Sequence, residues 1–453
     1  YFDDLNAKSP KNRRIWHQSL ITSWILENTV GVGTGWEPYP TSLRIVNWLK
    51  FALSTQELST EAYMSLVIQA RWLSRRIEWH ILGNHIMANA KALYFCGLVF
   101  EGKEAEVWYK KGLSIILNEL QEQVLPDGGH FELSPMYHAL AVEDFLDIIN
   151  VARCFGRPED VRSLEKILPE MLTWLRSMSH PDGKISFFND SATNIAPDNR
   201  QIVNYATRLG IQFEDAPGCK VLSESGYFRL VNFKAVLIGD IGRIGPDYLP
   251  SHAHADTLSF ELSLFGQRVI VNSGTSEYGN GSERLRQRGT LAHSTILINK
   301  KNSSDVWSGF RVGERARPEA VAFQILDAKP TVQGSHDGYR TEAGSPIHQR
   351  KWTLKPGLLL IQDTIFASSS YDIDAVFRLH PAILAVKNYG NSFTLTLPSG
   401  DVSLFEYPAS VDVSLDATTW HPEFGSTKES SLIRFTKKCK GTITLEFHFT
   451  WTE

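Results

Sequence analysis

The stretch Ile443-Thr444-Leu445-Glu446-Phe447-His448-Phe449-Thr450-Trp451 decides the fold of the second half of the chain. Apolar residues hold every second position in it, and mostly polar residues hold the positions between. Because side chains of a strand point alternately to its two faces, this pattern predicts a β-strand with one buried face. Phe393, Leu395 and Leu397 alternate in the same way. Many such short segments separated by Gly, Pro and Asn turns predict an antiparallel β-sandwich.

The first half of the chain has a different period. Apolar residues there follow one another at steps of three or four, as in Ala62, Leu66, Ala70, Leu73 and Ile77. The same spacing recurs in residues 113–124, 140–152 and 171–178, with short connections such as Pro126-Asp127-Gly128-Gly129 between the segments. This spacing predicts amphipathic helices, and helices joined by short turns indicate a helical array or toroid.

The period changes near Ala216-Pro217-Gly218, which we take as the domain boundary. A chain of 453 residues is too long for one ordinary domain, and 42% hydrophobic residues suffice for two cores. We therefore expect a multidomain α + β protein, with a helical domain at residues 1–217 and a β-sandwich at residues 218–453.

Charge and composition exclude several classes of function. A net charge of −4 gives no global basic field for nucleic acid, so an anionic ligand would need a local Arg cluster. No apolar run reaches the length of a membrane span, and no signal peptide is visible. Four widely spaced Cys fit no metal motif and are interpreted as free thiols, although a disulfide stays open for an exported protein.

Histidines gather in the segment from Ser251 to Thr295. It begins Ser251-His252-Ala253-His254-Ala255-Asp256, continues to Asn272-Ser273-Gly274-Thr275 and ends with Leu291-Ala292-His293-Ser294-Thr295. Two His separated by one residue would share a face of a strand, which is the conformation we expect here. Clustered imidazoles indicate a metal site or a site that handles protons and anions, with core histidines as the alternative.

The helical half carries a second polar constellation. Asn84 and His85 are adjacent, so on a helix they can reach one site only near its end or beside a groove. Ser134-Pro135 is a typical helix start, which would place Tyr137 and His138 in the opening turn, near the positive end of the helix. That position favours a developing phenolate, while simple packing of Tyr137 remains the alternative.

Taken in order, these motifs resemble the heparinase II/III family of polysaccharide lyases. The likeness runs from about Trp16 to about Arg317 and includes 131–138 and Arg288-Gly289-Thr290-Leu291-Ala292-His293-Ser294-Thr295. It implies an incomplete (α/α) toroid followed by an antiparallel β-sandwich that contributes His252 to the cleft. It also implies β-elimination at a uronic acid, in which the C5 proton is removed, the C4 glycosidic oxygen leaves and an unsaturated uronate forms.

The resemblance assigns roles to single residues. Asn84 and His252 would neutralise the uronate carboxylate and stabilise the enolate-like charge. Tyr137 would protonate the leaving oxygen, and would also act as base when proton and leaving group lie on the same face of the sugar. His85 would be the base when they lie on opposite faces.

Other residues are expected to bind substrate. Arg284 and Arg288 fit the family pattern best, while the second group, Arg311, Arg315 and Arg317, fits a solvated charged loop equally well. The remaining candidates for substrate binding are His138, Glu132 and Trp36, the last as part of a sugar-stacking wall. The segment from Pro181 to Asp190 is expected to be a loop that borders the cleft.

The resemblance further implies one zinc or other divalent ion held by His254, Asn272 and His293. Relatives have Asp where this chain has Asn272, and a neutral amide is a poor zinc ligand. Without metal, the same three residues would form a hydrogen-bonded brace for the loop that carries His252.

Two other functions stay open. A glycoside hydrolase on a toroid would need two carboxylates flanking the bond; Asp127, Glu132 and Asp144 are candidates, but they form no recognisable pair. A non-catalytic glycan-binding protein would keep affinity without turnover. For the lyase, the expected partner is a uronate polysaccharide, either heparan sulfate-like or a bacterial exopolysaccharide, capsule or O-antigen chain. The expected location is periplasmic or secreted in a bacterium, and the oligomeric state is unknown.

Overall fold

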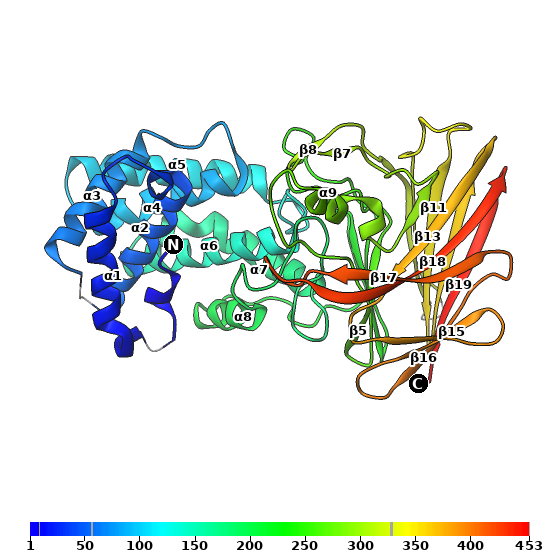
Figure 1. Ribbon diagram of the computed structural model, residues 1–453. Coiled ribbons are helices and arrows are strands. Elements are labelled where there is room, and N and C mark those ends of the chain that lie inside the picture. Colours follow the sequence, from blue (N-terminus) through cyan, green and yellow to red (C-terminus); the bar gives the residue numbers. More distant parts are fainter. Residues whose placement is uncertain (9, 56–57, 327–328, 453) are drawn as a thin grey trace. The chain divides into compact units, whose positions relative to one another are not determined.

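The computed structural model describes residues 1–8, 10–55, 58–326 and 329–452. The chain forms two compact units (Figure 1). The first is Tyr1–Val124 with Glu143–Leu168, and the second is Leu125–Val142 with Pro169–Glu453. The first is the helical unit and the second is the β-rich unit.

Helices dominate the sequence up to residue 208, as predicted. Their bounds are α1 Arg14–Glu27, α2 Pro38–Thr55, α3 Thr60–Ser74, α4 Gly83–Val99, α5 Lys103–Gln123, α6 Pro135–Cys154, α7 Arg162–Ser177 and α8 Asn199–Arg208. A short helix, α9 Ser282–Arg288, lies in the β-rich unit. None of the helices in the described ranges is both long enough and apolar enough to cross a membrane.

Helix starts follow local chemistry. The Ser59 side chain accepts a hydrogen bond from the Ala62 amide and caps α3. Helix α6 begins at Pro135, with the Tyr137 amide donating to the Ser134 hydroxyl at 3.2 Å, so the predicted start is confirmed. Helix α4 begins at Gly83, because Leu82 before it has a φ of 67°, which is not helical. Asn84 and His85 therefore lie in the first turn, near a helix end.

A buried ion cluster joins α4 to α6 within the helical unit. Lys91 Nζ donates to Asp144 Oδ1 at 2.8 Å and to Asp147 Oδ2 at 2.6 Å, and Lys50 Nζ donates to Asp147 at 3.0 Å. Burial alone would raise the pKa of Asp147, but the two lysine charges outweigh it and lower that pKa to about 2. Asp147 is therefore held as a buried carboxylate, and its charge depends on the lysines that contact it.

We expect Lys91→Met to lower the free energy of unfolding by about 3 kcal/mol, because it leaves Asp147 buried with one cation fewer. Urea unfolding followed by circular dichroism measures the change. The matched control is Lys110→Met, which removes an exposed partner of Glu106 and should cost less than about 0.5 kcal/mol. Equal losses in the two variants would contradict a structural role for the cluster.

Over its described residues, the β-rich unit contains four sheets, with antiparallel pairing between their neighbouring strands. The first has the order β1-β2-β3-β4-β5: Lys220–Leu222, Tyr227–Val231, Ala235–Asp240, Phe260–Leu264 and Gln267–Ile270. The largest has the order β14-β15-β16-β19-β12-β11-β10-β9: Leu384–Lys387, Ser392–Thr396, Val402–Glu406, Ile443–Trp451, Leu358–Phe366, Ile347–Lys355, Lys329–His336 and Pro318–Leu326. A four-stranded sheet follows β17-β18-β13-β6: Asp412–Trp420, Lys428–Lys440, Ser370–Arg378 and Ile296–Ile298. Strands β7 Val306–Trp307 and β8 Arg311–Val312 form a two-stranded hairpin.

Strand β19 confirms the alternation that decided the fold. Phe447 and Phe449 are fully buried, and they pair across the sheet with Ile361 and with Leu359. On the other side of β19, Phe405 pairs with Phe449, and their rings stack at 4.1 Å. This core extends over the strands of the first three sheets, so buried apolar area stabilises them together.

Part of the helical sequence packs with the β-rich unit. Trp174, Met178 and Phe188 share a small core with Tyr227 and Ile238 of the first sheet. Secondary structure changes where predicted, since the strands begin at Lys220, but this core explains why residues 125–142 and 169–217 belong to the second compact unit.

Candidate active site

A buried carboxylate, Asp190, organises the polar centre of the β-rich unit. It receives hydrogen bonds from His252 Nδ1 at 2.9 Å, His254 Nε2 at 2.8 Å and Arg284 Nη2 at 2.7 Å, and a second bond from Arg284 Nη1. Burial would raise the pKa of Asp190, but the charge of Arg284 and these hydrogen bonds hold it well below its ordinary value. An ionised carboxylate can only accept, so both histidines donate to it.

The loop that carries Asp190 is joined to the loop that carries the histidines. The Asp190 amide donates to the His252 carbonyl at 3.0 Å, and the His254 amide donates to Asn189 Oδ1 at 2.9 Å. The Asn189 amide donates to Asp256 Oδ2 at 3.2 Å. These bonds fix both loops without regular secondary structure.

The expectation that His252 and His254 lie on a strand is wrong. Residues 251–259 form a loop between β3 and β4. The two side chains nevertheless reach the same partner, because Asp190 presents one carboxylate oxygen to each ring.

Tyr137 and Tyr278 lie beside His252. The Tyr137 ring is 4.1 Å from the His252 ring, and its hydroxyl is 2.9 Å from the hydroxyl of Tyr278. Tyr137 is 8% exposed and Tyr278 is 37% exposed, so the pair leads from the buried anchor toward solvent. The His252 side chain is 13% exposed, whereas the Asp190 and Arg284 side chains are fully buried. A phenol, an imidazole and a fixed anion in this order can exchange protons with a bound ligand.

Several predicted substrate-binding residues have structural roles instead. Arg284 is bound to Asp190, and Arg288 donates to the backbone carbonyls of Ala253, Ser308 and Arg311. Both guanidinium groups are buried and fully engaged by protein acceptors. They therefore hold the site together and are not free to bind a substrate anion.

The other predicted binding residues are also buried. His138 Nε2 donates to the Met171 carbonyl at 2.9 Å, and its Nδ1 accepts from the His130 amide. Glu132 is 3% exposed, with its carboxylate 3.9 Å from His130 Nδ1. Trp36 is 3% exposed, with its ring packed between other tryptophans of the helical unit, so it offers no face to a sugar.

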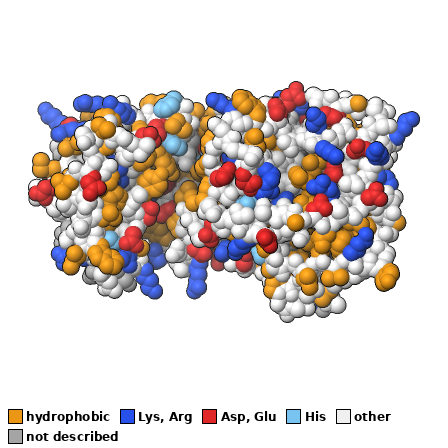
Figure 2. Space-filling model, viewed as in Figure 1, with side chains coloured by type: hydrophobic (Ala, Val, Ile, Leu, Met, Phe, Trp, Pro, Cys, Tyr) orange, Lys and Arg blue, Asp and Glu red, His pale blue; other side chains and the backbone are white. Residues whose placement is uncertain are grey.

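The second Arg group matches the charged-loop interpretation in part. Arg315 donates to Asp247 Oδ1 at 3.0 Å and to the Asp247 carbonyl at 2.8 Å. It lines a hollow of 430 Å³ with Arg243, Arg317 and Arg340, and carboxylates lie between these arginines. Basic and acidic side chains are likewise mixed over the visible face in Figure 2.

Asn84 and His85 are placed in the helical unit. His85 Nδ1 is 3.1 Å from Glu78 Oε1, and the Tyr39 ring lies 4.4 Å from the His85 ring. Glu78 in turn accepts from Asn89 Nδ2 at 3.0 Å. Their predicted roles in substrate chemistry stay predictions.

His254 and His293, two of the three predicted metal ligands, contact each other in the β-rich unit. His254 Nδ1 lies 3.2 Å from His293 Nε2, and burial lowers the pKa of both rings, so both are neutral. Both amide atoms of Asn272 and His293 Nδ1 are buried without a hydrogen-bond partner within the described ranges. Two neutral imidazoles and a free amide oxygen are compatible with a divalent ion, while no group of three His, Cys, Asp or Glu in the described part of the chain is arranged to hold one.

Backbone constraints explain the Asn272-Ser273-Gly274-Thr275 motif. The backbone amide of Asn272 donates to the buried carboxylate of Glu261 at 2.8 Å. The backbone amide of Ser273 donates to the carbonyl of Ala292. Gly274 has a φ of 75°, and a Cβ there would overlap the carbonyl of His421. The motif thus positions Asn272 by main-chain contacts.

The comparisons with known proteins agree with this architecture. Residues 13–211 match the heparinase II/III N-terminus model and residues 214–448 match the heparinase II/III-like C-terminal model. The crystal structure of heparinase III superposes with a TM-score of 0.81 at 18% identity, covering 99% of this chain and 75% of that one. This likeness confirms a fold of the toroid and β-sandwich class. The chain belongs to the heparinase II/III family.

Three curated relatives are heparin-sulfate lyases, and a fourth, 25% identical over 269 residues, is the FtsZ-localized protein C of Caulobacter vibrioides. A heparin-sulfate lyase of Bacteroides stercoris is 29% identical over 274 residues, which are 55% of this chain and 40% of that protein. A heparin-sulfate lyase of Pedobacter heparinus is 27% identical over 318 residues, which are 62% of this chain and 47% of that protein. The aligned region is therefore less than half of each of these two relatives.

Sequence reasoning missed Asp190 and Tyr278. Asp190 was included only as the end of a loop, and Tyr278 follows the Asn272 motif without any motif of its own. The sole sequence signal for Asp190 is an acidic residue in a polar segment. Its partners are supplied by residues more than 60 positions away.

Asp256 and Asp240 form a buried pair of carboxyl groups in the β-rich unit. Burial raises the pKa of both groups, and the repulsion between them raises that of Asp240 further. A pKa raised by folding contributes stability below the unfolded value, and the contribution is lost as pH rises through the folded value.

We therefore expect the stabilising contribution of this pair to be lost as pH rises above about 4, with the Asp256 share lost by about pH 7, and Asp256→Asn to reduce this loss. Asn keeps an oxygen that can accept from the Asn189 amide. Urea unfolding across this range measures the effect, with the exposed Asp247→Asn as control. A slope unchanged by Asp256→Asn would contradict a raised pKa of Asp256.

Proposed function

We propose that the chain is a polysaccharide lyase that cleaves a uronate-containing glycan by β-elimination. The observation that carries the proposal is the contact between Tyr137 and His252, with His252 held by the ionised Asp190. Membership of the heparinase II/III family and the names of the curated relatives support it.

The chemistry follows from the residues in contact. His252 Nδ1 is engaged by Asp190, so its Nε2 is the ring atom left for a ligand, and an N–H there would bind and neutralise a uronate carboxylate. The C5 proton then becomes acidic enough to be removed. Tyr137 acts first as base and then as acid. As a phenolate it receives the C5 proton, and it then returns a proton to the glycosidic oxygen as the bond from C4 to that oxygen breaks.

The proposed substrate class is a heparan sulfate-like glycan or a bacterial exopolysaccharide, capsule or O-antigen chain. The buried state of Arg284 and Arg288 favours a weakly charged uronate polymer, since neither arginine is available for a sulfate. A periplasmic or secreted location follows from such a substrate.

We expect Tyr137→Phe to lower kcat by at least about 1,000-fold, because the ring stays and only the proton-carrying oxygen is lost. Ultraviolet absorbance of the conjugated double bond measures turnover on heparan sulfate, heparin, alginate, hyaluronan and bacterial exopolysaccharides. The matched control is Tyr389→Phe, at a fully exposed tyrosine of the same unit.

The alternatives give different results. New reducing ends without ultraviolet absorbance would show hydrolysis. Binding of a glycan with neither signal on any polymer of the panel would favour a non-catalytic protein. Full activity in a folded Tyr137→Phe protein would contradict the proposed mechanism.

We propose, secondly, that His254, His293 and Asn272 take up a divalent ion with a structural role. Such an ion would use His254 Nδ1, His293 Nε2 and Asn272 Oδ1, with His254 Nε2 still donating to Asp190. The two unpartnered atoms of the Asn272 amide support this, because a buried amide without partners is costly.

We expect Asn272→Asp to bind zinc more tightly than the wild type, since it restores an anionic ligand. Metal content after dialysis and the thermal unfolding midpoint with and without zinc give readouts that do not depend on turnover. His293→Ala is the control that should remove uptake from both backgrounds. Absence of zinc uptake in both the wild type and Asn272→Asp would favour the hydrogen-bonded brace.

A further inference from the structure

Tyr278 has no assigned role, yet its hydroxyl lies within hydrogen-bond distance of the hydroxyl of the proposed catalytic tyrosine. It lies between β5 and α9, and its oxygen is 2.9 Å from that of Tyr137. Both residues belong to the β-rich unit. The contact is therefore internal to that unit and part of its folded structure.

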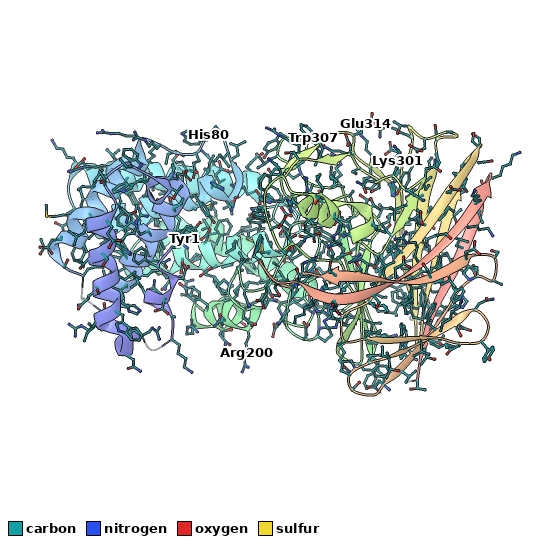
Figure 3. The ribbon with its side chains drawn as sticks, viewed as in Figure 1. Tyr1, His80, Arg200, Lys301, Trp307 and Glu314 are labelled. Carbon is teal, nitrogen blue, oxygen red and sulfur yellow. The ribbon has the colours of Figure 1, made fainter. Side chains whose placement is uncertain are left out.

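The Tyr278 ring is held on several sides. The Phe424 ring lies at 4.9 Å and the Phe310 ring at 5.4 Å, both edge-on. The Arg284 guanidinium lies 5.0 Å from the centre of the Tyr278 ring. Phe310 comes from the turn of the β7–β8 hairpin, whose neighbouring residues Trp307 and Glu314 are labelled in Figure 3. A ring fixed in this way keeps its hydroxyl in one place.

Charges around Tyr278 favour its protonated form. The residue is 37% exposed, but burial of its hydroxyl and the negative charge of Asp190 raise its pKa well above the ordinary value, while Arg284 opposes this only in part. Tyr137 is its hydrogen-bond partner, and the His252 ring lies 6.1 Å away. Tyr278 therefore keeps its proton throughout the working pH range, so it can always donate.

We propose that Tyr278 is a positioning residue that donates a hydrogen bond to the Tyr137 oxygen and stabilises the phenolate form of Tyr137. This inference rests on the proposed lyase function. A hydrogen bond to an anion is stronger than one to a neutral phenol, so the donor favours the ionised state of Tyr137.

The proton balance of the reaction is unchanged by this role. The C5 proton moves to the Tyr137 oxygen, the C4–O bond breaks with its electron pair on oxygen, and a proton from Tyr137 completes the leaving hydroxyl. Tyr278 keeps its own proton at every step. It changes only how easily Tyr137 reaches the phenolate form and how precisely that oxygen is aimed.

The decisive variant is Tyr278→Phe, which keeps the ring and its contacts and removes one oxygen. We expect kcat to fall by about 10- to 100-fold with KM within about twofold, because one donor to a charged group is lost. The limb of the kcat profile that reports Tyr137 ionisation should move to higher pH by about one unit. Tyr389→Phe, at an exposed site, is the control for the substitution itself.

A second variant tests the donor chemistry apart from the fold. Tyr278→His restores an aromatic ring with an N–H donor, and we expect it to recover part of the rate lost in Tyr278→Phe. The thermal unfolding midpoint is measured for each protein. If Tyr278→Phe does not fold, activity and the pH profile of Tyr278→His against wild type carry the comparison.

Three results would overturn the inference. They are an unchanged kcat and pH profile in Tyr278→Phe, a lower kcat without a pH shift, and a Tyr278→His protein no more active than Tyr278→Phe. If Tyr137→Phe is inactive, each of these results contradicts the proposed role of Tyr278 and leaves the proposed lyase function in place. An active Tyr137→Phe protein would instead overturn the proposed function, so the two failures are distinguishable.

Discussion

The buried carboxylate of Asp190 is the interaction on which the rest of the site depends. Removing a carboxylate from water is costly, and here Arg284 offsets that cost with paired hydrogen bonds from one guanidinium group. The remaining lone pairs accept from His252 and His254. Three chain segments therefore converge on one charge: the loop after α7, the loop before β4, and α9. Loss of that charge would remove one acceptor that all three segments share, while the main-chain bonds between the two loops would remain.

Asp190 is bound on one side by buried arginine and on the other by residues that lie closer to solvent. Arg284 and Arg288 are buried and occupied by protein acceptors, so their positive charge stabilises the fold and the anchor. His252, Tyr137 and Tyr278 lie on the solvent side of Asp190. The His252 side chain is 13% exposed, Tyr137 is 8% exposed and Tyr278 is 37% exposed. A substrate would therefore meet phenols and an imidazole first. Such a surface suits proton transfer at a uronate better than strong binding of sulfate groups.

The fold could be predicted largely from the sequence because its periods are local. The alternation in residues 443–451 and the three- and four-residue steps of the helices require only side-chain direction. The helix start at Ser134-Pro135 also followed from local capping chemistry. The strand expected for His252 and His254 was wrong, because tertiary hydrogen bonds with Asn189 and Asp190 override the local pattern.

The site could be predicted only in part. Motif order identified Tyr137 and His252, whose contact the structure shows. Burial could not be inferred from motifs: Trp36, His138, Glu132, Arg284 and Arg288 are buried, and their predicted roles in substrate binding stay predictions. Asp190 and Tyr278 depend on partners that are distant in sequence, so no spacing rule reveals them. Sequence motifs indicated candidate residues, and the structure shows which groups each of them contacts.

The most direct test of this account is the protonation of the His252 ring, measured by nitrogen-15 NMR of histidine-labelled protein, with His252→Gln to assign the signal. An ionised Asp190 that accepts from Nδ1 requires a proton on that nitrogen in both the neutral and the charged ring. The account therefore predicts a protonated Nδ1 at neutral pH, and loss of that preference in Asp190→Asn. A neutral His252 with its proton on Nε2 and a bare Nδ1 would contradict it, because Asp190 would then not be the acceptor that holds the site together.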